Sequence, residues 1–256
     1  MTTNTATAAN ARAIGVRRAW VVLWLAVACA LAALLAGPGY RWGWWGLGAG
    51  IQTLMGAAIV AAVVFVLALL GSVLARRQRQ GRSLALFLSA AALCLLTWVP
   101  PAALGWRARQ LPPIHDISTD TGNPPQFKAV LPLRQGAPNS TAYSADVAAQ
   151  QQRAYPEIAP AVLALAAPEA LARAERVARA MGWAIVAVAA GEGRIEATAT
   201  TLLFGFKDDI VIRITPQGNG SRVDLRSLSR VGRSDLGVNA SRIHTFLQKL
   251  QAEAAV

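Results

Sequence analysis

Three long apolar runs dominate the first part of the chain. They cover residues 19–36, 51–75 and 84–105, and none of them contains a charged residue. A helix needs ~20 apolar residues to cross the hydrocarbon core of a bilayer, and each run is close to that length. The pattern therefore predicts three transmembrane helices that contact a lipid bilayer.

A different periodicity begins at residue 168. Apolar residues recur at helical spacing from Leu171 to Met181, and Gly182 follows as a typical helix end. Shorter segments then alternate apolar and polar residues, which is typical of half-buried strands. We predict strands at 183–190, 194–200, 208–214 and 221–229, and a last amphipathic helix at 239–250.

These elements predict an α+β fold. Strands joined by short turns pair antiparallel, and two amphipathic helices would cover one face of the sheet. We expect this two-layer sandwich to span residues 168–256, behind a membrane domain at 19–106. The proline-rich segment between them, 107–167, contains apolar residues such as Phe127 that a free linker would lack. We predict that it is an extended arm lying on the sandwich, so that arm and sandwich form one domain outside the membrane.

The charge distribution excludes a nucleic-acid-binding protein. The net charge is +12, but residues 1–110 hold ten arginines and no acidic residue. The rest of the chain has 15 basic residues (25 − 10) against 13 acidic ones, a net charge of only +2. The folded part therefore lacks the basic surface that nucleic acid requires. With 54% hydrophobic residues, the chain is also too apolar for an ordinary soluble protein.

The basic residues that flank the apolar runs predict the orientation. Three arginines precede the first run and four follow the second, whereas the intervening loop has only Arg41. Positive loops stay in the cytoplasm, so we place residues 1–18 there and the C-terminal domain outside, although Arg107 and Arg109 oppose this mildly. In a chain with this bacterial-looking composition, we expect a multi-pass protein of the inner membrane with a periplasmic domain. The basic start also allows the alternative of a cleaved signal peptide.

The segment 229–243, SRVGRSDLGVNASRI, concentrates polar chemistry before the last helix. Backbone N–H groups at a helix start and nearby guanidinium groups suit an anion. The candidate anion-binding residues are Arg226, Arg230, Gly232, Arg233, Asn239 and Arg242, with Asn239 a plausible N-cap. The alternative is that these arginines are neutralised within the domain. The candidates for such structural ion pairs are Asp208, Asp209, Arg213, Asp224 and Asp235.

Catalytic and metal sites receive little support from the residue types. The weak candidates for a cation site are His115, Asp116 and Asp120, which are equally suited to capping turns in the arm. A hydrolase would draw on Asp116, Asp120 and Asp209. Both cysteines, Cys29 and Cys94, lie in apolar runs, so no thiol serves the exported part. We expect no cofactor.

Several longer stretches resemble a known family. These are IHDISTDTGNPPQF, AYPEIAP, FGFKDDIVIRI and VDLRSLSRVGRSDLGVNASRI, which occur in this order between residues 111 and 250. Together they resemble the family called domain of unknown function 1499. The resemblance implies a domain often found behind membrane helices, without an established activity, and it supplies no catalytic residues. We therefore expect a non-catalytic module that binds an envelope protein or an anionic ligand, with a hydrolase as the alternative.

Overall fold

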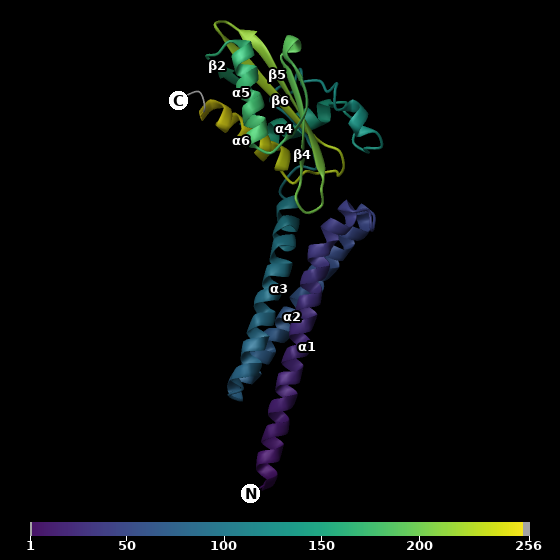
Figure 1. The fold of residues 1–256 in the computed structure, drawn as a ribbon, viewed down its shortest axis with the longest axis vertical. Coiled ribbons are helices and arrows are strands. Elements are labelled where there is room, and N and C mark those ends of the chain that lie inside the picture. The colour runs from purple at the N-terminus through teal and green to yellow at the C-terminus, as the bar shows by residue number, and fades with distance from the viewer. Residues whose placement is uncertain (1, 253–256) are drawn as a thin grey trace. The chain divides into compact units, whose positions relative to one another are not determined.

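The computed structural model describes residues 2–252, with side chains described from residue 12 onward. The chain forms two compact units (Figure 1). The helical unit comprises the residues up to 106 together with Leu203–Gly205. The sheet unit comprises residues 107–202 and those from 206 onward.

Three long helices build the helical unit. They are α1 (Thr2–Arg41), α2 (Leu47–Arg77) and α3 (Gly81–Ala108). Each contains one of the predicted apolar runs, and each is long and apolar enough to cross a membrane. The predicted helices are confirmed, and by length and composition the chain is a multi-pass membrane protein.

Small side chains line the contacts among the three helices. They let helix backbones approach closely, which is a main source of helix association in lipid. Larger side chains point outward: Leu34 is 63% exposed and Leu96 is 75% exposed. Both cysteines are buried in this packing, as predicted. The buried residues of the cluster are Ala26, Cys29, Ala61, Val64, Ala68, Ala90, Ala91 and Cys94.

A six-stranded antiparallel sheet organises the sheet unit. The predicted strands are present as β3 (Ala184–Ala189), β4 (Arg194–Thr200), β5 (Lys207–Gln217) and β6 (Gly220–Ser229). They are joined in succession, with a turn at residues 218 and 219 between β5 and β6. The strand order is β1-β6-β5-β4-β3, and β2 also pairs with β6.

The arm is more regular than its sequence indicates. It contributes β1 (Asp116–Ser118) and β2 (Ala161–Leu163), which pair antiparallel with the two halves of β6. Strands of three residues are too short to show an alternating pattern, so the sequence does not reveal them. The arm also forms the 3-10 turn η1 (Leu131–Arg134) and the helix α4 (Ala145–Ala154).

Two helices cover one face of the sheet. They are α5 (Ala167–Ala180) and α6 (Val238–Ala252), and the short 3-10 turn η2 (Ala190–Glu192) links β3 to β4. Their apolar sides meet the inward residues of the strands, and Trp183 stacks on Phe246 with ring centroids 5.3 Å apart. This confirms an α+β fold with an antiparallel sheet and two helices.

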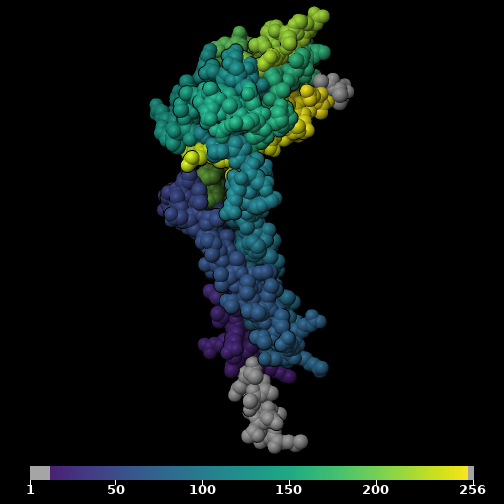
Figure 2. Space-filling view, turned by 180° about the vertical axis from the view of Figure 1, so that it is seen from behind, coloured from purple at the N-terminus to yellow at the C-terminus, as the bar shows by residue number. Residues whose placement is uncertain are grey.

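The arm covers the opposite face of the sheet. Phe127 and Val130 of the arm pack on Val211 of β5 and Leu228 of β6. In Figure 2 the teal residues of the arm spread over this side of the sheet unit. The predicted contact between arm and sandwich is therefore present, and it turns what would be a solvated sheet face into an interior.

Candidate functional site

The sheet face under the arm is built largely from charged residues. Side chains alternate along a strand, so Asp209 and Arg213 of β5 project from the face opposite Ile210. By the same alternation, Asp224 and Arg226 of β6 project toward the arm. Asp209, Asp224 and Arg226 are each 0% exposed. A buried charge is tolerated only when it is paired and hydrogen-bonded, so the partners of each group decide its role.

Arg226 pairs with Asp116 of β1. Its Nε and Nη2 donate to the two carboxylate oxygens at 2.9 and 2.7 Å. The same guanidinium donates to the backbone oxygens of Pro125 and Thr141 at 3.3 and 2.7 Å. It also lies 5.0 Å from the centre of the Phe127 ring and 5.2 Å from that of the Tyr143 ring. Arg226 is therefore surrounded by hydrogen-bond acceptors and aromatic rings.

Two arginines donate hydrogen bonds to Asp209. Arg230 donates to it through Nε and Nη2, both at 2.8 Å, and Arg134 of η1 donates through Nη1 at 2.6 Å. The hydroxyl of Thr198 donates at 2.7 Å. Burial opposes ionisation of Asp209, but the hydrogen bonds from Arg230, Thr198 and Arg134 outweigh it and hold the pKa of this carboxyl below its usual value. Asp209 is thus a fixed anion, unsuited to exchange a proton near neutral pH.

Nearer the other end of β6, two carboxylates and two arginines form a further cluster. Arg213 and Arg222 each donate to both Asp120 and Asp224, at distances from 2.9 to 3.1 Å. Thr119 adds a hydroxyl donor to Asp224 at 3.3 Å. Asp224 and Arg213, both among the candidates for structural ion pairs, bind each other. The partner of Arg226, in contrast, is Asp116 of the arm and not a carboxylate of the β5–β6 hairpin.

Arg242 and Asn239 belong to α6, which covers the other face of the sheet. Arg242 donates to Asp208 at 2.6 Å and to the Ser227 hydroxyl at 2.9 Å. Asn239 is 0% exposed, and its amide donates to the His115 backbone oxygen and to Ser229 Oγ, both at 3.0 Å. Its side-chain oxygen accepts from Ser227 at 2.7 Å. Asn239 therefore holds the start of α6 against β6 and β1.

Asp235 binds backbone donors at the start of α6. Its carboxylate accepts from the backbone N–H groups of Gly237 and Asn239, which places the helix start at Val238 and Asn239 inside the helix. Burial raises the pKa of Asp235, partly offset by those two hydrogen bonds. The carboxylate grouped with the ion pairs from sequence thus satisfies backbone donors. Asn239, which was expected to be the N-cap, lies inside the helix, and its N–H is bound by Asp235. The tight turn explains the difference, since Gly237 has φ +78°.

Arg233 differs from the other arginines of the segment. Its side chain is exposed, and among the described residues no hydrogen bond or ion pair engages its guanidinium. It follows Gly232, which has φ +96°, and the Gly232 carbonyl accepts from Asn139 at 2.9 Å. The structure therefore does not bring the six candidate anion-binding residues together as one open site. It leaves Arg233 as an exposed cation on a loop that its neighbours hold in place.

The weak metal candidates do not form a joint site. Asp116 is bound by Arg226, and Asp120 is bound by Arg213 and Arg222. His115 Nδ1 lies 3.3 Å from the backbone oxygen of Arg233. Within the described part of the chain, no group of three or more His, Cys, Asp or Glu residues is placed to hold a metal ion. The hydrolase candidates Asp116, Asp120 and Asp209 likewise lie in separate arginine clusters.

Several residues that hold the arm were not singled out from the sequence. Glu196 accepts from three successive backbone N–H groups, those of Lys128, Ala129 and Val130, at 2.9 to 3.1 Å. The Gln151 amide of α4 binds both the N–H and the carbonyl of Ser118 in β1, at 2.8 and 2.6 Å. Glu196 could have been found, because it is the one acid on the polar side of a strand over which the arm was expected to lie. Gln151 and Arg134 gave no comparable signal.

Comparison with known proteins places this domain in a family. No curated protein matches the chain. A family model described as protein of unknown function (DUF1499) matches residues 116–250. The match begins at β1 and ends within α6, so it covers most of the arm, the sheet and both helices, and it spans more than half of the chain. The chain belongs to the DUF1499 family.

Proposed function

We propose that the protein is a non-catalytic binding module of a bacterial inner membrane. Its three spans would hold the DUF1499 domain on the periplasmic side, where Arg233 contacts an anionic group of an envelope component. The observation that carries this proposal is the contrast between Arg233, which is exposed and unengaged among the described residues, and Arg230 and Arg242, which are bound to carboxylates.

The bound arginines contribute by fixing the loop. Arg230 also donates to the Leu133 backbone oxygen at 2.6 Å, and Asn139 donates to the backbone oxygens of Ser229 and Gly232. A loop held at this many points presents Arg233 in one place, which reduces the entropy lost on binding. A guanidinium suits phosphate or carboxylate because it can donate two parallel hydrogen bonds. The ligand is therefore an anion that carries a carboxylate or a phosphate group.

A binding measurement on the full-length protein tests the site. The protein in nanodiscs of neutral lipid is titrated by calorimetry with inorganic phosphate and, separately, with a soluble short-chain phosphatidylglycerol. We expect binding by the wild-type protein and a loss of about tenfold or more in affinity for Arg233→Ala. Lys249→Ala removes another exposed positive charge of the same unit and should have no effect. Equal affinities of Arg233→Ala and wild type, or binding of neither probe, would overturn the site.

A separate experiment tests the orientation. The proposal rests on the arginines that flank α1 and α2, and it predicts that an alkaline phosphatase fused after residue 252 is active, whereas one fused after residue 79 is not. Alkaline phosphatase folds only in an oxidising compartment, because it needs disulfides. The reverse activities would place the DUF1499 domain in the cytoplasm. The phosphate titration tests the Arg233 site independently of this result.

A further inference from the structure

The turn that joins β4 to β5, residues 201–206, carries an unusual set of side chains at its tip. The turn is closed by two hydrogen bonds, from the Thr201 N–H to the Phe206 carbonyl and from the Phe206 N–H to the Thr201 hydroxyl, both 2.8 Å. The residues between Thr201 and Phe206 include Leu202, Leu203 and Phe204. Leu202 is 90% exposed and Leu203 is 40% exposed. Turn tips are normally polar, so adjacent large apolar residues held outward by a closed turn point to an interaction surface.

The turn lies at the end of the sheet where the chain arrives from α3. Thr200 pairs with Lys207, Asp208 pairs with Ser229, and Leu228 pairs with Asp116 at the start of β1. Only seven residues, 109–115, separate the end of α3 from β1. Seven extended residues reach at most about 25 Å. The connection from α3 to this end of the sheet is therefore short.

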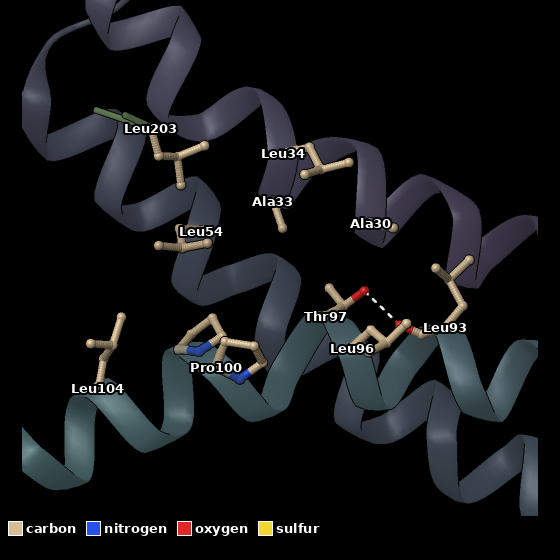
Figure 3. Close-up of a pocket in the computed structure, with 11 residues that line it drawn as sticks. Ala30, Ala33, Leu34, Leu54, Leu93, Leu96, Thr97, Pro100, Leu104 and Leu203 are labelled. Carbon is tan, nitrogen blue, oxygen red and sulfur yellow. Dashed lines mark hydrogen bonds between the residues drawn. The ribbon is translucent and has the colours of Figure 1, made fainter. Parts of the chain in front are cut away.

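Part of the turn contacts the three candidate spans. Leu203–Gly205 belong to the helical unit. Leu203 lines an apolar cavity of about 300 Å³ together with residues of all three candidate spans, as Figure 3 shows. The ring of Phe204 lies 6.4 Å from that of Tyr40, near the end of α1. Leu54, Leu96 and Leu104 line the same cavity, so Leu203 lies among side chains that suit hydrocarbon.

Charge near the turn complements an anionic lipid surface. The turn contains no acidic residue and is followed directly by Lys207, while Arg109 lies in the short connection from α3. Lys207 is exposed, and its carbonyl accepts from the Arg230 N–H at 2.9 Å. Basic residues beside an apolar tip extend their charged ends toward lipid phosphates while the tip enters the acyl region.

We propose that the turn 201–206 is a second membrane anchor, in which Leu202 inserts into the bilayer that the three helices cross. The partner is the lipid bilayer, at the boundary between headgroups and acyl chains. Transfer of a leucine side chain from water into an apolar environment is favourable. That is enough to hold one end of the sheet at the surface, because the tether has already removed most of the cost of association. This anchor needs neither an anion bound at Arg233 nor a particular orientation across the membrane.

Photo-crosslinking to lipid tests the anchor in the full-length chain. A benzophenone amino acid replaces Leu202 in one protein and Asn219, exposed in the turn at the opposite end of the sheet, in another. Each protein is reconstituted in vesicles whose lipids carry a radiolabel on the acyl chain. We expect labelled protein from position 202 and none above background from position 219. The unfolding temperatures of both proteins confirm that the substitutions preserve the fold.

Two outcomes would overturn the anchor. One is an absence of lipid crosslinks from position 202 in excess of position 219. The other is crosslinking from position 202 exclusively to the protein's own helices, which would mean that the tip packs on protein and not on lipid. Adding Arg233→Ala to the position-202 protein separates this inference from the proposed function. Lipid crosslinking should persist there even if phosphate binding is lost.

Discussion

Arg226 and Asp116 form a buried pair with two hydrogen bonds, of 2.9 and 2.7 Å, although 110 residues separate them in the sequence. The pair joins the start of the arm to the last strand of the sheet. Two charges in the interior compensate each other only while both are present. Removal of one partner from a buried pair typically costs about 3–5 kcal/mol, because the other charge is left without compensation.

We therefore expect Arg226→Ala to lower the stability of the DUF1499 domain by about 3–5 kcal/mol. Arg226→Lys should recover only part of the loss, because an ammonium cannot reproduce the two parallel hydrogen bonds to Asp116. Chemical unfolding of the full-length protein in detergent, followed by circular dichroism, measures both effects. The control is Lys249→Ala, an exposed charge expected to change stability by less than about 0.5 kcal/mol. A mild effect of Arg226→Ala, comparable to that control, would show that the pair does not hold the arm.

The pH dependence of stability should reveal Asp209. Its pKa is lowered in the folded state, so its contribution is fully present above the unfolded-state pKa of about 3.9 and is lost as the pH falls below that value toward the folded-state pKa. We expect Asp209→Asn to be less stable than wild type at neutral pH, and the difference to shrink below about pH 4. Thermal unfolding measured from neutral to acidic pH tests this. A difference that stays constant over the acidic range would contradict the assignment of Asp209 as an ionised partner of Arg230 and Arg134.

Glu196 should control the attachment of the arm. Its carboxylate binds three successive N–H groups at residues 128–130, so Glu196→Ala leaves these donors without a partner in the interior. We expect the arm to open locally, and limited proteolysis between residues 135 and 144 to accelerate at least tenfold. Glu175→Ala, on the exposed side of α5, serves as the control. Unchanged cleavage of Glu196→Ala would mean that the apolar contacts of Phe127 and Val130 suffice to hold the arm.

Two neighbouring glycines offer a matched test of the β3–β4 connection. Gly193 has φ +58°, and a Cβ added there would lie 2.2 Å from the Ile214 backbone oxygen. A Cβ at Gly191 would meet no atom within 4 Å. Gly193→Ala should therefore destabilise the domain by about 1–3 kcal/mol, since both the backbone conformation and the contact are unfavourable. Gly191→Ala should be near neutral in the same unfolding assay. Equal effects of the two substitutions would contradict this placement of the turn.

Local patterns were sufficient for much of the fold. Isoleucine at every second position, Ile210, Ile212 and Ile214, predicted β5 and the face it buries. The three apolar runs predicted the membrane helices, because composition alone distinguishes a span from a soluble helix. The last helix was predicted within one residue at its start, although Asn239, the predicted N-cap, lies inside the helix. That difference depends on the positive φ of Gly237, which no periodicity reveals.

The ionic layer could not be assigned from sequence in detail. Charge count predicted that the arginines of 226–242 had enough carboxylates nearby, but not which pairs form. Arg226 finds Asp116 only because β1 pairs with β6, and a three-residue strand leaves no pattern. Arg134 joins Asp209 across 75 residues for a similar reason. Long-range pairing of this kind depends on how the arm crosses the sheet, which local propensity does not determine.

The contrast between Arg230 and Arg233 is the most direct test of the division of roles within the loop. Stability and affinity for inorganic phosphate are measured on the same preparations of wild type, Arg230→Ala and Arg233→Ala in neutral-lipid nanodiscs. We expect Arg230→Ala to lower the unfolding temperature by several degrees, because Asp209 loses one of its two arginines. Arg233→Ala should unfold at the wild-type temperature and lose phosphate binding. A destabilised Arg233→Ala that still binds phosphate like wild type would contradict the assignment of Arg233 as the contact residue.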